Sequence, residues 1–299
     1  MSDNLNYAGW KKWFPTDDTW SVLATFQGDL KVSILKRDFP EVELPDTLEN
    51  EYLLVCVKDD NREKLDRVYC RKGDHLLKVS RQSINFDGKI ASKRTNITSR
   101  NDQQICAIDL LHDNTVTVKG LGGRWGSGKT LLLVTAGLEA LDTNRFERIV
   151  WIRNNTDVAN TKDLGALPGE VNDKLLPYLG PFIDHAGQAK VDCMLRNGKI
   201  VIEPLQSLRG RNFENTLIMC SEAENLTKEH LQLIIARAAE GSEVWLDFDI
   251  KQRDKKVFEE SRGVEKMIDR LAGQKLFGYV KLVECERSAT AALADLLDD

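Results

Sequence analysis

The sequence predicts an α/β protein with a mainly parallel sheet flanked by helices, preceded by a small β-rich N-terminal domain. From residue 101 onward, short apolar runs alternate with stretches of helical spacing, a pattern typical of a parallel sheet covered by helices. Before residue 100, runs of alternating apolar and polar residues are separated by Gly, Asp and Pro, which favours antiparallel strands. We therefore expect two domains, residues 1–100 and residues 101–299.

The composition bounds the class of protein. The chain has 299 residues, of which 41% are hydrophobic and 30% charged, which excludes a disordered or fibrous protein. Its net charge of −5 argues against a protein that coats nucleic acid through bulk positive charge. The N-terminus lacks the apolar core of a signal peptide, and no run reaches the roughly 18 apolar residues that span a bilayer. We expect a cytoplasmic protein with no membrane partner.

The cysteines do not form a recognisable pattern. No CxxC pair and no neighbouring histidine accompanies them, which argues against a zinc site or a disulfide framework. We expect buried free thiols at Cys56, Cys70, Cys106, Cys193, Cys220 and Cys285.

The N-terminal domain combines strand-like runs with an uneven charge. The expected strands are Trp20–Phe26, Leu30–Leu35, Tyr52–Lys58, Leu65–Tyr69 and His75–Ser80. Residues 1–60 sum to −6, whereas residues 61–100, the basic segment, sum to +7. The basic segment has two equally weighted interpretations: a phosphate-contacting surface for nucleic acid, or the solvated face of a small domain.

The second domain alternates strands with helices. The expected strands are Thr115–Val118, Arg148–Arg153, Ile200–Ile202, Thr216–Cys220, Glu243–Leu246 and Tyr279–Val283. The expected helices are Ile105–Leu111, Thr130–Leu141, Lys228–Ala239, Val257–Leu271 and Ala289–Leu297. Because the run from Ile149 to Ile152 is continuously apolar, we expect a sheet that is buried on both faces.

One glycine-rich segment gives the strongest indication of function. Residues 123–130, Gly-Arg-Trp-Gly-Ser-Gly-Lys-Thr, fit G-x-x-x-x-G-K-[ST] and lie between an expected strand and an expected helix. Such a loop turns backbone N–H groups and a helix N-terminus towards phosphate. Lys129 would reach the β- and γ-phosphates, and the Thr130 hydroxyl would ligate Mg²⁺. The sequence thus predicts a P-loop NTPase whose nucleotide contacts Gly123, Arg124, Trp125, Gly126, Ser127, Gly128, Lys129 and Thr130.

A glutamine upstream of this loop is a candidate base reader. Gln104 precedes an apolar helix and lies nineteen positions before Gly123, a spacing that resembles the adenine-reading glutamine of superfamily 1 helicases. Its side-chain amide offers one acceptor and two donors, and can therefore read both N6 and N7 of adenine. The alternative is an exposed glutamine at a helix start.

The strand Thr216–Cys220 ends in polar residues, as a Walker B strand does. Such a strand usually ends in Asp-Glu, where the Asp holds Mg²⁺ and the Glu polarises the attacking water. Here Ser221 replaces the Asp and Glu222 is retained, so we assign Ser221 and Glu222 to the metal side together with Thr130. Asp249 or Glu224 could supply the missing carboxylate; alternatively, the strand is buried and its polar end is incidental.

Together with further segments, these motifs resemble the PhoH family of P-loop ATPases, from about residue 100 to the C-terminus. One additional matching segment is residues 163–169 (Asp-Leu-Gly-Ala-Leu-Pro-Gly), followed by Asp173, Lys174, Pro177 and Tyr178. The other matching segments are residues 208–213, 249–254, 261–263 and 286–288. The sequence departs from the family pattern at Asn212, Ser221, Glu224 and Phe248. Residues 20–104 resemble the connector that follows a PIN ribonuclease domain in longer relatives. Because no acidic quartet precedes it, we expect no nuclease domain.

The resemblance implies a helicase-like motor core that binds ATP with Mg²⁺. It adds Asp249 and Gln252 to the nucleotide contacts, and it implies that arginines supply charge to the γ-phosphate, from a neighbouring subunit in a ring. The candidates for this catalytic role are Arg209, Arg211, Arg237 and Arg287. The same resemblance implies a homo-oligomeric ring, with a hexamer as the candidate size. It also implies a cytoplasmic location, which is the host cytoplasm if the chain is of phage origin.

Three functions remain open at this point. The leading hypothesis is an ATPase or helicase-like motor that acts on RNA or single-stranded nucleic acid. The second is a nucleotide-gated, ring-forming binding module with weak or no hydrolysis, because Ser221 replaces the Walker B Asp. The third and weakest is a P-loop kinase of a small metabolite.

Overall fold

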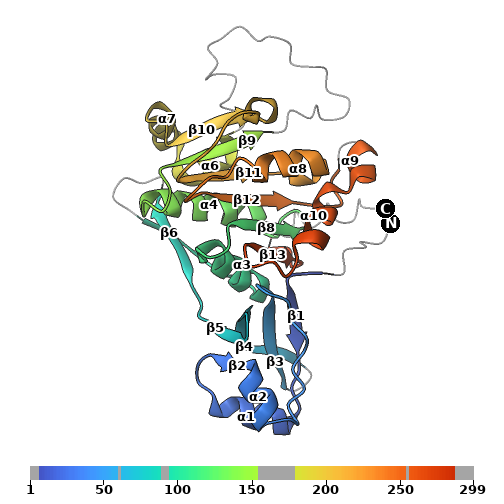
Figure 1. The fold of residues 1–299 in the computed structure, drawn as a ribbon. Helices are drawn as coiled ribbons and strands as arrows, with labels where there is room; N and C mark the ends of the chain where they lie inside the picture. The colour runs from blue at the N-terminus through green and yellow to red at the C-terminus, as the bar shows by residue number, and fades with distance from the viewer. Residues whose placement is uncertain (1–6, 60–61, 89–93, 154–178, 254–255, 287–299) are drawn as a thin grey trace.

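The computed structural model describes residues 7–59, 62–88, 94–153, 179–253 and 256–286 (Figure 1). Its larger part is built on a six-stranded sheet in which every pair of neighbours is parallel. From one edge to the other, the strands are β10 (Ile200–Pro204), β9 (Arg148–Arg153), β11 (Thr216–Cys220), β12 (Glu243–Phe248), β8 (Val118–Gly123) and β13 (Phe277–Leu282). The prediction of a parallel α/β fold is confirmed.

Helices cover both faces of this sheet. Alternate residues of one strand point to opposite faces. Trp151 and Trp245 belong to the core under α3, α4, α6 and α7. Val150 and Leu246 belong to the core under α8 and α10. The helices are α3 (Asp102–His112), α4 (Lys129–Asp142), α6 (Gly180–Ala186), α7 (Gln188–Arg196), α8 (Lys228–Ile235), α9 (Lys256–Ser261) and α10 (Gly263–Leu271), with short 3-10 turns η2 (Leu205–Leu208) and η3 (Ala223–Asn225).

The N-terminal part forms a separate five-stranded sheet at the end of the molecule far from β10 (Figure 1). Its strands, in spatial order, are β1 (Trp10–Trp13), β3 (Tyr52–Asp59), β4 (Arg62–Lys72), β5 (His75–Val79) and β2 (Leu30–Lys31). Leu53 and Tyr69 pack in a core of their own with residues of α1 (Asp17–Thr25) and α2 (Val32–Asp38). On the opposite face, Tyr52 and Leu54 join the core that contains α3.

A hairpin of β6 (Ser83–Asp87) and β7 (Arg94–Thr98) lies against α4 rather than on the N-terminal sheet. The Asn85 N–H donates to Glu139 Oε1 at 2.7 Å, and Phe86 is fully buried in the α4 core. Residues before position 100 therefore also cover the larger sheet. The domain boundary at residue 100 stays a prediction.

Two expected N-terminal strands are wrong. Trp20–Phe26 lies almost wholly in the helix α1, because the Thr16 side chain caps its start by accepting from the Thr19 N–H, and the helix buries Thr19 and Leu23. Of Leu30–Leu35, only the first two residues form a strand, and the rest begin α2. Aromatic and β-branched residues suggested strands here, but α1 has a side-chain cap, and both helices bury apolar residues in the N-terminal core.

In the larger domain, several helices and strands begin or end at residues other than those predicted from the sequence. The expected helix Val257–Leu271 is two helices, because Arg262 adopts a left-handed backbone with φ 47° between them. The helix α8 stops at Ile235, and the strand expected at Thr115–Val118 begins only at Val118. The helix expected at Ala289–Leu297 lies outside the described residues.

The structure also bears on the expectations for the cysteines and for apolar helices. All six cysteines are free, but Cys193 and Cys285 are exposed, so the expectation of burial is wrong for these two. Among the described residues, no helix is long and apolar enough to cross a bilayer.

Candidate functional site

The glycine-rich loop joins the end of β8 to the start of α4. Gly126 and Gly128 have φ of 73° and 92°, a left-handed backbone that other residues rarely adopt. No side chain caps the first turn of α4, so its N–H groups are left for a ligand. The loop therefore has the backbone shape that the phosphate-binding motif requires.

Neighbouring segments hold this loop from outside. The Trp125 N–H donates to Asp249 Oδ2 at 3.1 Å, and the Glu286 N–H donates to the Gly126 carbonyl at 2.9 Å. Lys129 Nζ donates to the Arg124 carbonyl at 2.8 Å. The loop is thus preformed. Lys129 folds back onto it, in a position from which its ammonium group could contact a bound phosphate.

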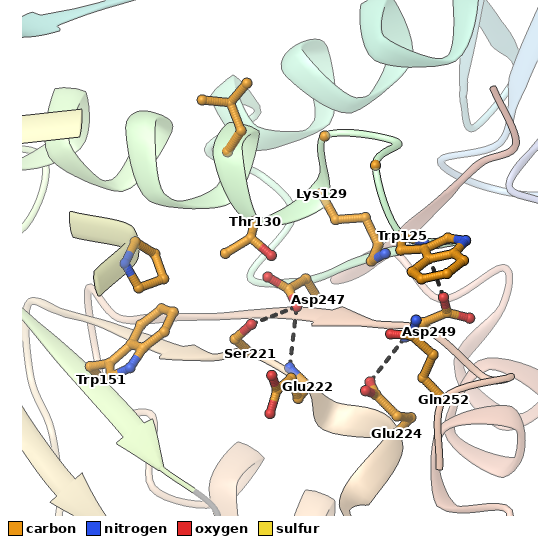
Figure 2. Close-up of a pocket in the computed structure, with 14 residues that line it drawn as sticks. Trp125, Lys129, Thr130, Trp151, Ser221, Glu222, Glu224, Asp247, Asp249 and Gln252 are labelled. Atoms are coloured by element: carbon orange, nitrogen blue, oxygen red, sulfur yellow. Dashed lines mark hydrogen bonds between the residues drawn. The ribbon is translucent and has the colours of Figure 1, made fainter. Parts of the chain in front are cut away.

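Beside the loop lies a cavity of about 510 Å³, a volume typical of ligand pockets. Its walls come from the loop, the start of α4, the carboxyl ends of β11 and β12, and an apolar side made by Leu131, Trp151 and Pro181 (Figure 2). The predicted site residues that line it are Trp125, Gly126, Gly128, Lys129, Thr130, Ser221, Glu222, Glu224, Asp249 and Gln252. Gly123, Arg124 and Ser127 belong to the loop without lining the cavity.

Asp247, near the end of β12, is a carboxylate in this cavity that the sequence analysis missed. Its side chain is buried, with 2% exposed. Ser221 Oγ donates to Asp247 Oδ1 at 2.8 Å, and the Glu222 N–H donates to the same oxygen at 3.2 Å (Figure 2). Burial raises the pKa of Asp247, whereas the hydrogen bonds and the Lys129 charge act in the opposite direction. The expected strand Glu243–Leu246 ends one residue before Asp247, and no sequence motif points to this position.

Glu222 and Glu224 follow β11 and have different surroundings. Glu222 has a left-handed backbone, φ 56° and ψ 42°, and its exposed side chain borders the cavity. Glu224 is buried, and its Oε2 accepts the Asp249 N–H at 2.9 Å. Burial raises the pKa of Glu224 to about 8. Glu224 therefore supports Asp249, which in turn holds the Trp125 N–H.

Gln104 is buried at the start of α3, with 4% of its surface exposed. Its Oε1 accepts the Arg100 N–H at 2.9 Å, and its Nε2 donates to the Ser127 carbonyl at 3.1 Å. The glutamine is thus not an exposed helix-start residue; it connects α3 to the phosphate loop. It does not line the cavity, and its contact with adenine stays a prediction.

The described arginines lie outside the cavity. Arg209 and Arg211 follow η2, and Arg211 pairs with Glu203 on the edge strand β10 at 3.0 Å. Arg237 donates to the Arg211 carbonyl at 3.1 Å. Three strands separate β10 from β8, so this cluster is remote from the loop of its own chain. Arg287 lies outside the described residues, as do residues 154–178, which include the segment 163–169.

Part of the basic segment has internal partners. Arg67 donates to the Leu23 and Phe26 carbonyls at the end of α1, at 3.1 and 3.0 Å. Lys72 forms an ion pair with Asp113. Arg62 and Lys64 on β4 are exposed, so they are the better candidates for contact with nucleic acid.

A parallel sheet, a glycine-rich loop between strand and helix, and carboxylates at the neighbouring strand ends define a P-loop NTPase. The family described as PhoH-like protein matches residues 96–293. The chain belongs to the PhoH family, which is a family of P-loop ATPases.

Curated relatives agree with this assignment. Protein PhoH2 of Mycolicibacterium smegmatis is 33% identical over 77% of this chain and 51% of its own length. Protein PhoH2 of Bacillus subtilis is 35% identical over 67% of this chain and 48% of its own. Protein PhoH of Escherichia coli is 29% identical over 64% and 55%. The chain thus spans about half the length of the curated relatives that it matches.

Proposed function

We propose that this protein binds ATP in the cavity beside residues 123–130 and hydrolyses it as a motor on RNA or single-stranded nucleic acid. The observation that carries the proposal is the preformed loop, with Lys129 and the N-terminus of α4 beside Glu222. Backbone N–H groups and Lys129 would bind the phosphates, and Glu222 would orient the attacking water. Family membership supports the ATPase part of the proposal.

The residues of the cavity suit Mg²⁺, which such ATPases ordinarily use. Mg²⁺ binds hard oxygen ligands and usually takes only one or two protein carboxylates, with water and substrate phosphates completing its shell. The Thr130 hydroxyl and the buried carboxylate of Asp247 offer such oxygens. Among the described residues, no group of three or more His, Cys, Asp or Glu could hold a metal without phosphate. The ion would neutralise charge on the phosphates when bound.

The arginine cluster beside β10 favours action between subunits. Arg209, Arg211 and Arg237 do not line the cavity of their own chain, so in our proposal they reach the γ-phosphate of a neighbouring subunit in a ring. Ring formation, a hexameric size and a nucleic-acid partner all belong to this proposal.

A nucleotide-gated binding module is the second candidate, and Ser221 at the Walker B position favours it. Multiple-turnover ATP hydrolysis, measured with and without single-stranded RNA, separates the two functions. We expect turnover that RNA stimulates and that Lys129→Ala abolishes, whereas Lys275→Ala, at an exposed lysine outside the cavity, leaves it unchanged. Tight ATP binding without turnover in either condition would favour the binding module.

A further inference from the structure

The ends of β11 and β12 place Ser221 and Asp247 side by side. The two strands are parallel neighbours, with Cys220 opposite Leu246. Ser221 and Asp247, which follow these two residues, are therefore also opposite each other. Met219 and Trp245, two positions earlier, face the core under α4. Because side chains alternate along a strand, Ser221 and Asp247 face α4 as well.

Asp247 is nearer to the loop strand than Ser221 is. β12 pairs directly with β8, with Asp247 opposite Leu121, whereas β11 is one strand further away. Figure 2 shows the Asp247 carboxyl group below the Thr130 hydroxyl and above Ser221 and Glu222. A carboxylate at this position therefore reaches the first turn of α4, where the metal-binding hydroxyl lies.

The hydrogen bonds of Asp247 are incomplete. Oδ1 accepts from Ser221 and from the Glu222 backbone, and the Thr130 hydroxyl interacts with the carboxylate, but buried Oδ2 has no partner among the described residues at full hydrogen-bond geometry. A buried carboxylate oxygen without a hydrogen-bond partner carries a desolvation penalty. A cation bound in the cavity would remove this penalty, and neither Ser221 nor the backbone does so.

We propose that Asp247 supplies the carboxylate of the Mg²⁺ site that Ser221 no longer supplies, so that the metal-binding function has moved by one strand, from β11 to β12. This inference rests on the proposed ATP-binding function. Ser221 then acts as a positioning residue: its hydroxyl holds Oδ1 and leaves Oδ2 directed to the metal. The arrangement also explains how the site can work although the Walker B Asp is missing.

Exchange of the two side chains tests the proposal. The affinity for a fluorescent ATP analogue is measured with Mg²⁺ and with a chelator, in the wild type, Asp247→Ser, Ser221→Asp and the double variant. We expect Mg²⁺ to strengthen binding to the wild type. Asp247→Ser should lose about tenfold or more of that enhancement while keeping its metal-free affinity, because Lys129 and the loop remain. The double variant, with its carboxylate on β11, should recover part of it.

The single variant Ser221→Asp is the converse. It places two carboxylates within about 3 Å, where they repel each other and one is held protonated. We therefore expect weaker Mg²⁺ enhancement than in the double variant. Asp247→Asn, which keeps the shape of the side chain and an acceptor for Ser221, replaces Asp247→Ser if that variant does not fold.

Two failures remain distinguishable. If the wild type and Lys129→Ala bind the analogue equally, or neither binds it, the proposed function is wrong. If the wild type binds and Asp247→Ser or Asp247→Asn keeps the full Mg²⁺ enhancement, or the wild type has none, Asp247 is not the metal carboxylate and the inference is overturned.

Discussion

At the scale of single residues, Glu222 combines a functional position with an unfavourable backbone. A left-handed conformation costs a residue with a Cβ about 1–2 kcal/mol, and glutamate gains no local hydrogen bond that asparagine would make. In this structure φ of Glu222 is 56°, and the Glu222 N–H donates a hydrogen bond to Asp247 Oδ1. Strain of this kind gathers at functional sites.

We expect Glu222→Gly to raise the free energy of unfolding by up to about 1 kcal/mol relative to Glu222→Ala, because glycine adopts this backbone without strain. Both variants should lose ATP hydrolysis, since neither has a carboxylate to orient water. Urea denaturation followed by circular dichroism measures the difference. A glycine variant that is less stable than the alanine variant would mean that the backbone at residue 222 is not strained.

At the scale of elements, the loop strand β8 depends on its glycines. The rings of Phe248 and Tyr279 stack with centroids 5.6 Å apart. A Cβ on Gly122 would meet Tyr279 Oη at 2.5 Å and Phe248 Cε2 at 2.7 Å. Phe248, which stands where the family pattern has glycine, therefore fills the space over Gly122 and closes the core beside β12.

We expect Gly122→Ala to lower the free energy of unfolding by about 1–3 kcal/mol through overpacking. The loss should shrink in a Phe248→Leu background, which gives the new methyl group room. A double-mutant cycle in urea measures the coupling of the two positions. Additive effects would contradict the packing of Phe248 on Gly122.

Lys119 connects β8 to its surroundings and gives a pH dependence. Nζ donates to the carbonyls of Leu111 and Asp113 at 3.1 and 2.7 Å and pairs with Glu243 at 2.9 Å. Burial lowers the pKa of Lys119 from 10.5 to about 7. Between these values the unfolded chain binds a proton that the folded chain does not, so this lysine makes stability fall as the pH falls from 10.5 towards 7.

We expect Lys119→Met to lose this dependence, which amounts to at most about 1.4 kcal/mol per pH unit. The measurement is the free energy of unfolding of wild type and variant at about pH 7 and about pH 9.5. The wild type should gain stability relative to the variant at the higher pH. A difference that is the same at both values would mean that the pKa of Lys119 is not lowered.

The sequence was informative where a local pattern and the fold agree. The loop residues 123–130 and the strands β9 and β11 lie where their motifs and apolar runs predicted them. Asp247 was missed because it lies one residue beyond the apolar run that predicted β12, and its partner Ser221 is close only through sheet pairing. The role of Gln104 in holding the loop depends on a contact with Ser127, 23 positions away, which no local pattern reveals.

At the scale of the whole molecule, the charge of the basic segment divides into internal and exposed parts. Arg67 and Lys72 have internal partners, whereas Arg62 and Lys64 are exposed on β4. Neutralising the whole segment would therefore mix lost stability with lost binding.

We expect the double variant Arg62→Gln/Lys64→Gln to weaken RNA binding and to reduce the slope of log affinity against log salt by about 0.7 per lost phosphate contact. Lys31→Gln/Lys36→Gln removes the same charge from exposed positions in β2 and α2 and serves as the matched control. RNA affinity is measured by fluorescence anisotropy over a range of salt. Equal effects of the two double variants would exclude β4 as the contact surface.

The proposed function depends on phosphate binding by the loop at residues 123–130. Calorimetric titration of ATP in Mg²⁺ buffer, into wild type and Lys129→Ala, tests this most directly. Loss of one charge-assisted contact to phosphate corresponds to about 1.5–3 kcal/mol, so the variant should bind about 10- to 150-fold more weakly. A Lys129→Ala variant that binds ATP with the affinity of the wild type would contradict the proposed function.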